Sequence, residues 1–172
     1  MLKIPDPYPW YNYPMNKLVN GHIFYEDNPQ RHDYLFRVSL KAVIINENNE
    51  VLIVKESDRD WWDIPGGGMD HGESIREALA RELKEEVSLK GDFTYKVILA
   101  EDPRHLPTHN LYQMRLTFLI ENYKGDDFES GDDGDEVAFI DPEKFKNSEI
   151  VTERKIYEYS QLALAHRSRP RS

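Results

Sequence analysis

Apolar and polar side chains alternate along much of the chain between residues 36 and 140, which is the pattern of half-buried β-strands. In the first alternating segment, every second residue from Phe36 to Ile44 is apolar, so these side chains share one face of a strand. The asparagine-rich stretch 46–49 then indicates a turn. The pattern predicts five strands in all, at residues 36–44, 51–55, 95–100, 111–121 and 136–140.

Two further segments indicate helices. Residues 73–87 are rich in strong helix formers, and their apolar residues recur at helical spacing to form one stripe. The stripe consists of Ile75, Leu79, Leu83 and Val87. A second helix is predicted from about Ser148 to about His166, ahead of a basic tail that we interpret as solvated. Strands combined with two well-separated helices predict an α+β fold in which helices flank a mixed sheet.

The first 34 residues follow neither period and are rich in proline and aromatic side chains. We interpret residues 1–34 as an N-terminal extension and residues 35–172 as one domain, because 172 residues suit a single compact domain. The simplest role of the extension is to cover an apolar surface of the core. Contact in a homodimer and stacking on a nucleobase are alternative roles for its aromatic rings.

The formal net charge of −10 argues against a long DNA or RNA partner, because binding to a phosphate backbone normally depends on clustered lysine and arginine. A small anionic ligand remains compatible with this charge, since a divalent metal ion can bridge carboxylates and phosphates. The charge therefore favours a small nucleotide over a nucleic acid as the partner.

The chain contains no cysteine, which excludes disulfides, zinc–thiolate sites and thiol nucleophiles and favours a cytoplasmic location. No apolar run approaches the roughly 20 residues that a membrane-spanning helix requires, so we expect no membrane contact. Prolines interrupt the N-terminal stretch where a signal peptide would have its apolar segment, so we expect no export.

Acidic side chains crowd one side of the predicted helix 73–87. At about 100° per residue, Glu82, Glu85 and Glu86 fall within an arc of about 100° that borders the apolar stripe. A solvated glutamate-rich helix is the alternative interpretation, but like charges at the edge of burial repel one another and favour a bound cation. Ligands that offer only oxygen, without cysteine or a close histidine pair, indicate Mg²⁺, or Mn²⁺ as the alternative, rather than Zn²⁺.

The glycine-rich loop ahead of this helix extends the pattern. Trp62, Pro65 and Gly66 lead into Gly67, which is followed after five residues by Glu73. After seven intervening residues comes the run Arg81-Glu82-Leu83-Lys84-Glu85-Glu86-Val87-Ser88-Leu89. The 23 residues from Gly67 to Leu89 resemble the Nudix box, with Ser88 where the family has glycine. That glycine helps to end the helix, so we expect Ser88, with ordinary backbone preferences, to change the exit of the chain.

The resemblance implies the Nudix fold, in which a mixed β-sheet is sandwiched between α-helices. It also implies a metal-dependent hydrolase that cuts a phosphoanhydride bond in a nucleoside diphosphate linked to another moiety, such as an ADP-ribose-like or modified nucleotide. By the same resemblance Glu82, Glu85 and Glu86 are the metal ligands, joined by the carbonyl group of Gly66.

The resemblance further implies that Arg81 and Glu73 form a pair that orients the helix, with the forked guanidinium group holding carboxylates in place. An ordinary surface ion pair worth under about 1 kcal/mol is the alternative. A carboxylate must also accept a proton from the attacking water. Glu85 and Glu136 are both candidates for this base, because relatives place it either in the box or on a distant loop.

The main rival hypothesis is a catalytically silent module of the same fold that binds a nucleotide as a sensor. The retention of every acidic residue of the box favours the enzyme, because a binding module needs neither a proton acceptor nor a full metal cluster.

Overall fold

The computed structural model describes residues 15–19, 22–25, 28, 30, 32–56, 59–124, 128–132 and 134–167. The chain divides into two compact units. The first comprises Met1–Arg37 and Pro103–Gln113, and the second comprises Val38–Asp102 and Met114–Ser172. We describe each unit by itself.

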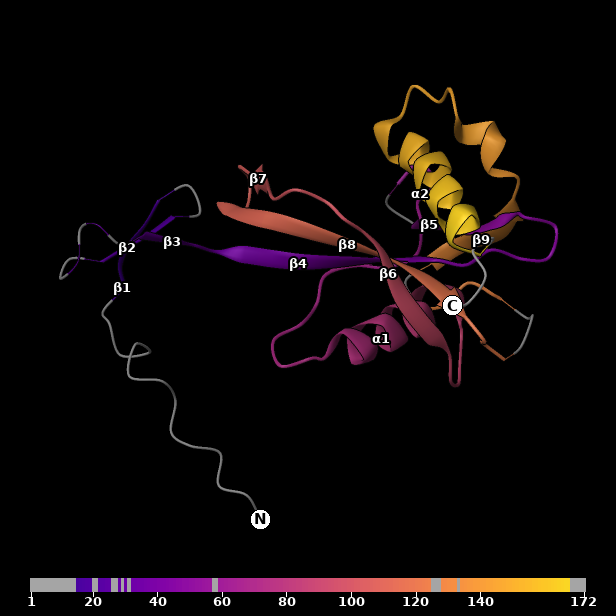
Figure 1. Ribbon diagram of the computed structural model, residues 1–172, viewed down its shortest axis with the longest axis horizontal. Coiled ribbons are helices and arrows are strands. Elements are labelled where there is room, and N and C mark those ends of the chain that lie inside the picture. The colour runs from indigo at the N-terminus through magenta and orange to yellow at the C-terminus, as the bar shows by residue number, and fades with distance from the viewer. Residues whose placement is uncertain are drawn as a thin grey trace, which may run out of the picture. The chain divides into compact units, whose positions relative to one another are not determined.

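The first unit contains a three-stranded antiparallel sheet in the order β1-β2-β3, drawn in indigo in Figure 1. Its strands are β1 (Met15–Val19), β2 (His22–Tyr25) and β3 (His32–Tyr34). A further short strand, β7 (Arg104–Leu106), pairs with the first residues of β8 (Leu111–Glu121).

The sequence pattern did not identify these three strands among the first 34 residues. The strands of this sheet have only three to five residues each, so one face carries two or three side chains. An alternation that short cannot be distinguished from chance in a sequence. The same reason accounts for β7, three residues long, which the sequence pattern did not predict.

The strands predicted in the second unit are all present. Strand β8 lies between β4 (Phe36–Val43) and β6 (Thr94–Ala100), and β5 (Val51–Glu56) pairs in antiparallel fashion with β9 (Gly134–Ile140). The first two residues of β4 and the first three of β8 belong to the other unit. Residues 47–49 form the predicted turn between β4 and β5.

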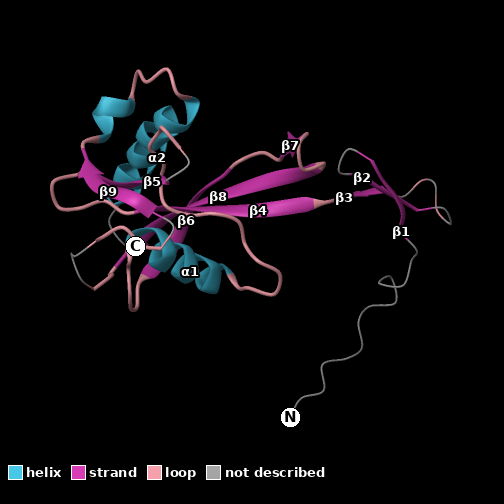
Figure 2. Ribbon diagram, turned by 180° about the vertical axis from the view of Figure 1, so that it is seen from behind, coloured by secondary structure: helices cyan, strands magenta, loops and turns pink. Residues whose placement is uncertain are grey.

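Two α-helices lie on opposite sides of these strands, as both Figure 1 and the reverse view in Figure 2 show. They are α1 (Ile75–Val87) and α2 (Val151–Arg167), and a short 3₁₀-helix, η2 (Pro142–Phe145), precedes α2. The α+β architecture, with strands sandwiched between helices, is confirmed. No helix in the described ranges is both long and apolar enough to cross a membrane.

Alternate residues of β4 and β5 pack against the two helices. The α1 side of the core contains Leu40, Ala42, Ile44, Leu52, Val54, Leu79 and Leu83. The α2 side contains Val43, Ile45, Val51, Ile53, Ile156, Tyr159 and Ala163. Both faces of these strands are thus buried, and the apolar stripe predicted on residues 73–87 is the surface by which α1 packs against them.

Helix α1 begins with a capping box, which explains why it starts two residues later than predicted. The Ser74 side chain accepts a hydrogen bond from the Glu77 backbone, and the Glu77 carboxylate accepts one from the Ser74 backbone at 2.8 Å. Ser74 is therefore the N-cap, and Glu73 lies outside the helix, where its carboxylate can reach across the first two turns.

The exit from α1 differs from the expectation for Ser88. Ser88 adopts the left-handed conformation itself, with φ 54° and ψ 18°, and its backbone N–H donates to the carbonyl of Leu83. Ser88 thus ends the helix in the way that a glycine would. The expectation that serine would change the exit is wrong, because the hydrogen bonds to the Leu83 carbonyl from Ser88 and from Leu89 outweigh the local backbone preference.

Replacement of Ser88 by glycine is expected to stabilise the protein. The left-handed conformation costs an L-residue about 1 kcal/mol or more, and glycine avoids this cost. The larger conformational entropy of glycine in the unfolded chain offsets part of the gain, so the free energy of unfolding should rise by about 0.5 kcal/mol. Urea unfolding followed by circular dichroism measures it. Ser88→Ala is the matched control, since it removes the hydroxyl and keeps the Cβ. Equal stability of the glycine and alanine variants would contradict this account.

Candidate active site

The glycine-rich loop 65–69 lies along β4 as a short extended segment. Three backbone hydrogen bonds hold it: Leu40 N to Gly67 O at 2.8 Å, Ala42 N to Pro65 O at 2.8 Å and Met69 N to Val38 O at 3.0 Å. Because β4 is a core strand, these bonds fix the loop to a rigid element. The loop therefore has a defined position beside the C-terminal half of α1, where Arg81, Glu82 and Glu86 contact it.

Two glycines of this loop permit close approaches that a side chain would block. Gly66 has φ +122°, and a Cβ there would lie 2.4 Å from the backbone oxygen of Leu40. A Cβ at Gly67 would lie 2.6 Å from Oε1 of Glu82. The carboxylate of Glu82 thus lies directly against the loop.

Glu86 connects α1 to the loop by a direct hydrogen bond. Its side chain is buried, with 6% of the residue exposed, and its Oε2 accepts a hydrogen bond of 2.7 Å from the backbone N–H of Gly66. A bond of this length to a carboxylate is charge-assisted and stronger than one between neutral groups. It fixes the loop against the acidic side of the helix.

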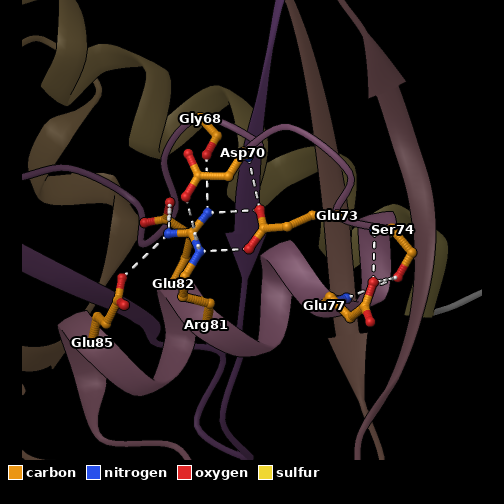
Figure 3. A network of polar contacts seen from close by, with 8 residues as sticks. All are labelled: Gly68, Asp70, Glu73, Ser74, Glu77, Arg81, Glu82 and Glu85. Carbon is orange, nitrogen blue, oxygen red and sulfur yellow. Dashed lines mark hydrogen bonds and ion pairs between the residues drawn. The ribbon is translucent and has the colours of Figure 1, made fainter.

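Arg81 lies at the centre of the acidic residues, as Figure 3 shows. Its Nε and one terminal nitrogen donate to the two carboxylate oxygens of Glu73, at 2.7 and 2.9 Å. The other terminal nitrogen donates to Glu82 at 2.7 Å and to Glu85 at 3.2 Å. A further bond of 3.0 Å reaches the carbonyl of Gly68. One guanidinium group thus joins the loop, the residue ahead of α1 and two of the helix carboxylates.

The electrostatic consequences differ among these groups. The side-chain hydrogen bonds from Arg81 lower the pKa of Glu73 to about 2. Burial raises the pKa of Glu82, and the hydrogen bond and charge of Arg81 oppose this effect. The pKa of Arg81 is raised, mainly by Glu73. Glu82 is therefore a buried acid whose charge depends on a nearby cation.

The depressed pKa of Glu73 predicts a contribution to acid stability. Since the folded-state pKa is lower than the ordinary value of 4.5, ionised Glu73 stabilises the fold above about pH 4.5, and this contribution is lost as the pH falls to about 2. We expect the difference in unfolding free energy between wild type and Glu73→Gln to shrink over that interval. Urea titrations at several pH values measure it, and a difference that stays constant down to about pH 2 would contradict the assignment.

The two candidates for the general base lie in different surroundings. The side chain of Glu85 is 36% exposed and uses one oxygen for Arg81. Glu136, on β9, is 58% exposed and pairs with Lys55 of β5 at 3.4 Å. Arg81 thus joins Glu82 to Glu85, and Gly66 binds Glu86, whereas the ion-pair partner of Glu136 lies on β5.

The chemistry of the donors fits a hard divalent cation. Glu82, Glu85 and Glu86 offer carboxylate oxygens from one side of one helix, and the first two share the positive charge of a single guanidinium nitrogen. Among the described residues, no three acidic or histidine groups already converge as a metal site would require. Arg81 instead holds Glu82 and Glu85, and the backbone N–H of Gly66 holds Glu86.

Lys41 belongs to this site although the sequence pattern did not identify it. Its Nζ donates to Oδ2 of Asp63 at 2.8 Å, to the carbonyl of Ile64 at 2.8 Å and to the carbonyl of Gly66 at 2.9 Å. The only signal in the sequence is a lysine inside the apolar strand segment that runs from Leu40 to Ile45. A charge at such a position is rarely buried unless it is paired.

Comparison with protein families gives a match over most of the chain: the family described as NUDIX domain matches residues 35–159. The chain is 32% identical over 108 residues to the uncharacterized Nudix hydrolase YvcI of Bacillus subtilis (strain 168). It is 42% identical over 71 residues to an RNA pyrophosphohydrolase of Ruthia magnifica subsp. Calyptogena magnifica. These matches cover 59% and 41% of this chain, but only 63% and 38% of the respective relatives.

Comparison with solved structures shows the same fold. The solution structure of the E. coli ORF135 protein matches with a TM-score of 0.60 and 17% identity, covering 80% of this chain and 96% of that protein. Such a match at low identity concerns the arrangement of helices and strands. The match to the family begins at residue 35, and the three-stranded sheet of the first unit precedes it.

Proposed function

Because the chain belongs to the Nudix family, we propose that it is a metal-dependent pyrophosphohydrolase that cuts a phosphoanhydride bond in a nucleoside diphosphate linked to another group. The observation that carries the proposal is the set of contacts around Arg81 and Gly66. These contacts hold Glu82, Glu85 and Glu86 beside a loop whose glycines permit the close approach of Glu82.

Each residue of this set has a role in the proposed reaction. Glu82, Glu85 and Glu86, with the carbonyl of Gly66, would hold Mg²⁺, which neutralises developing negative charge and activates water when bound. Arg81 orients the carboxylates of α1, and Glu73 fixes Arg81 through two hydrogen bonds. Either Glu85 or Glu136 accepts the proton from water.

Two observations favour this function over a nucleotide sensor. All the acidic residues of the box are present, and three of them contact the same arginine. The relatives described above include one named as an RNA pyrophosphohydrolase. Because the chain covers less than two thirds of each of these relatives, their names do not define the substrate here.

A substrate panel tests the proposal. The purified chain is incubated with Mg²⁺ or Mn²⁺ and with ADP-ribose, an oxidised nucleoside triphosphate, a dinucleoside polyphosphate or 5′-triphosphorylated RNA, and the products are separated by chromatography. We expect turnover of a small nucleotide, because the net charge of −10 disfavours RNA. Turnover that persists in excess chelator would contradict metal dependence. Nucleotide binding by calorimetry, without turnover of any substrate, would favour the sensor.

The identity of the base is tested by two matched variants, Glu85→Gln and Glu136→Gln. Loss of the proton acceptor is expected to abolish the acidic limb of the pH–rate profile in one variant only. If Glu136 is the base, metal affinity stays at the wild-type value in its variant, because the proposed ligands are untouched. If both variants keep the wild-type kcat and the wild-type pH–rate profile, neither residue is the base.

The remaining parts of the proposal are Mg²⁺ as the ion, a cytoplasmic location and assembly as a homodimer. Mg²⁺ is supported by the all-oxygen donor set and tested by the metal titration within the panel. The absence of cysteine supports the cytoplasmic location, which fractionation of cells tests. The aromatic N-terminal extension motivates the dimer, and sedimentation velocity with and without residues 1–34 tests it.

A further inference from the structure

We infer that Lys41 is a positioning residue of the active site: through the backbone of Gly66 it holds Glu86 in the orientation that binds metal. The inference deepens the proposed function and rests on it for the role of Glu86. Lys41 itself needs to touch neither the metal nor the substrate.

The ammonium group of Lys41 is fully engaged within the protein. A lysine has three N–H donors, and here three acceptors lie at 2.8 to 2.9 Å: the carboxylate of Asp63 and the carbonyls of Ile64 and Gly66. Only 6% of Lys41 is exposed. A buried ion pair on its own contributes little net stability, because the loss of hydration offsets the attraction. The two carbonyl contacts satisfy the remaining N–H donors of this buried group, and in doing so they tie the backbone of Ile64 and Gly66 to β4.

Gly66 is held from both ends of its backbone. Its N–H donates to Glu86 at 2.7 Å, and its carbonyl accepts from Lys41 at 2.9 Å. Its φ of +122° is a conformation that few residues adopt. A rotation of the peptide groups around Gly66 would break both hydrogen bonds, so Lys41 and Glu86 stabilise the same backbone conformation from opposite sides of one residue.

Strand β4 provides the rigid support for this arrangement. Lys41 lies between Leu40 and Ala42, two residues with no exposed surface whose backbones bond to the loop. Removal of the ammonium group would leave the carbonyls of Ile64 and Gly66 and the carboxylate of Asp63 without this donor. The loop would then relax, and Glu86 would lose the fixed geometry of its bond to Gly66. Residues that orient metal ligands in this way typically contribute about 10- to 100-fold to metal affinity.

Lys41→Met tests the inference, because methionine is similar in length and lacks both charge and donors. We expect the Mn²⁺ affinity, measured by calorimetry, to fall about 10-fold or more. We also expect the Gly66 amide signal in a ¹H–¹⁵N spectrum to move, because its short bond to Glu86 is weakened. Lys96→Met is the matched control: Lys96 lies on β6, is 40% exposed, and pairs with Glu121 at 3.7 Å. The control should change neither quantity.

The carboxylate of Asp63 separates positioning from simple loss of an ion pair. In Lys41→Met this carboxylate, whose side chain is 15% exposed, keeps its charge without its partner, so part of any defect is loss of stability. The double variant Lys41→Met/Asp63→Asn removes that uncompensated charge. We expect it to regain thermal stability while its Mn²⁺ affinity stays about 10-fold low, and we expect Asp63→Asn alone to bind Mn²⁺ within about twofold of wild type.

Several outcomes would overturn the inference. The first is wild-type Mn²⁺ affinity in the double variant, because only the ion pair would then matter. The second is tighter Mn²⁺ binding by Lys41→Met, because Lys41 would then compete with the metal for the carbonyl of Gly66. If Lys41→Met does not fold, the double variant Lys41→Met/Asp63→Asn, which leaves no uncompensated charge, carries the same measurements.

The inference and the proposed function can fail separately. Metal affinity and the Gly66 amide signal are read without turnover. Mg²⁺-dependent turnover by wild type, together with unchanged Mn²⁺ binding by Lys41→Met, would overturn the inference alone. Weakened Mn²⁺ binding by Lys41→Met, with no turnover by wild type on any substrate, would overturn the proposed function alone.

Discussion

Glu86→Gln is expected to lower kcat by about 100-fold or more while leaving the fold intact, because the amide lacks the charge that a hard cation requires. The buried side chain accepts one short hydrogen bond from Gly66, and the oxygen of glutamine can still accept it. Packing should therefore survive. Without metal, thermal stability should rise slightly, since one of three neighbouring like charges is removed.

Steady-state kinetics on the best substrate of the panel, calorimetric titration with Mg²⁺ and thermal unfolding measure these effects. Glu158→Gln is the matched control, because Glu158 lies on α2, has a side chain 54% exposed, and pairs only with Lys155 among the described residues. We expect the control to retain kcat. A soluble Glu86→Gln protein with wild-type kcat and wild-type metal affinity would show that Glu86 is not a ligand.

Arg81→Ala is expected to destabilise the metal-free protein by about 2 kcal/mol, which is less than the loss of a fully buried ion pair because a quarter of Arg81 is exposed. The main cost falls on Glu82, whose side chain is only 11% exposed and whose pKa burial already raises. Activity should fall as well, since the carboxylates of α1 lose their common partner. Saturating Mg²⁺ should recover part of the lost stability by supplying a replacement cation.

Two further variants make this experiment specific. Arg81→Lys keeps the charge but cannot hold both oxygens of Glu73 and reach the helix carboxylates, so we expect it to recover only part of the stability. Lys84→Ala removes an exposed cation of the same helix and should change the unfolding free energy by less than about 0.5 kcal/mol. If Arg81→Ala and Lys84→Ala have the same free energy of unfolding, with and without Mg²⁺, Arg81 does not hold the carboxylates in the way described.

The long elements and the acidic side of α1 could be predicted from the sequence because each rests on a local period. The helix from residue 75 to residue 87 keeps its apolar stripe over almost four turns, and β8 alternates over eleven residues. The spacing of Glu82, Glu85 and Glu86 likewise places these acidic residues on one side of α1. These features depend only on neighbours along the chain.

The rest depends on contacts between residues far apart in the sequence. The three acceptors of Lys41 lie 22 to 25 residues further along the chain, and no periodicity relates them to it. Ser88 is a case in which hydrogen bonding to the preceding turn overrides the residue's own preference. Glu136 could be placed at the start of a strand, but its partner Lys55 follows from the pairing of β5 with β9, which the alternation alone does not specify.

The hydrogen bonds between loop 65–69 and β4 have a consequence for motion in the active site. Leu40 and Ala42 have no exposed surface, and their backbone N–H groups donate hydrogen bonds to the carbonyls of Gly67 and Pro65. The loop cannot lift without uncovering a strand that is buried on both faces. It therefore acts as one more strand of the core, and we expect the amide hydrogens of Leu40 and Ala42 to exchange with solvent only through global unfolding, whether or not a ligand is bound.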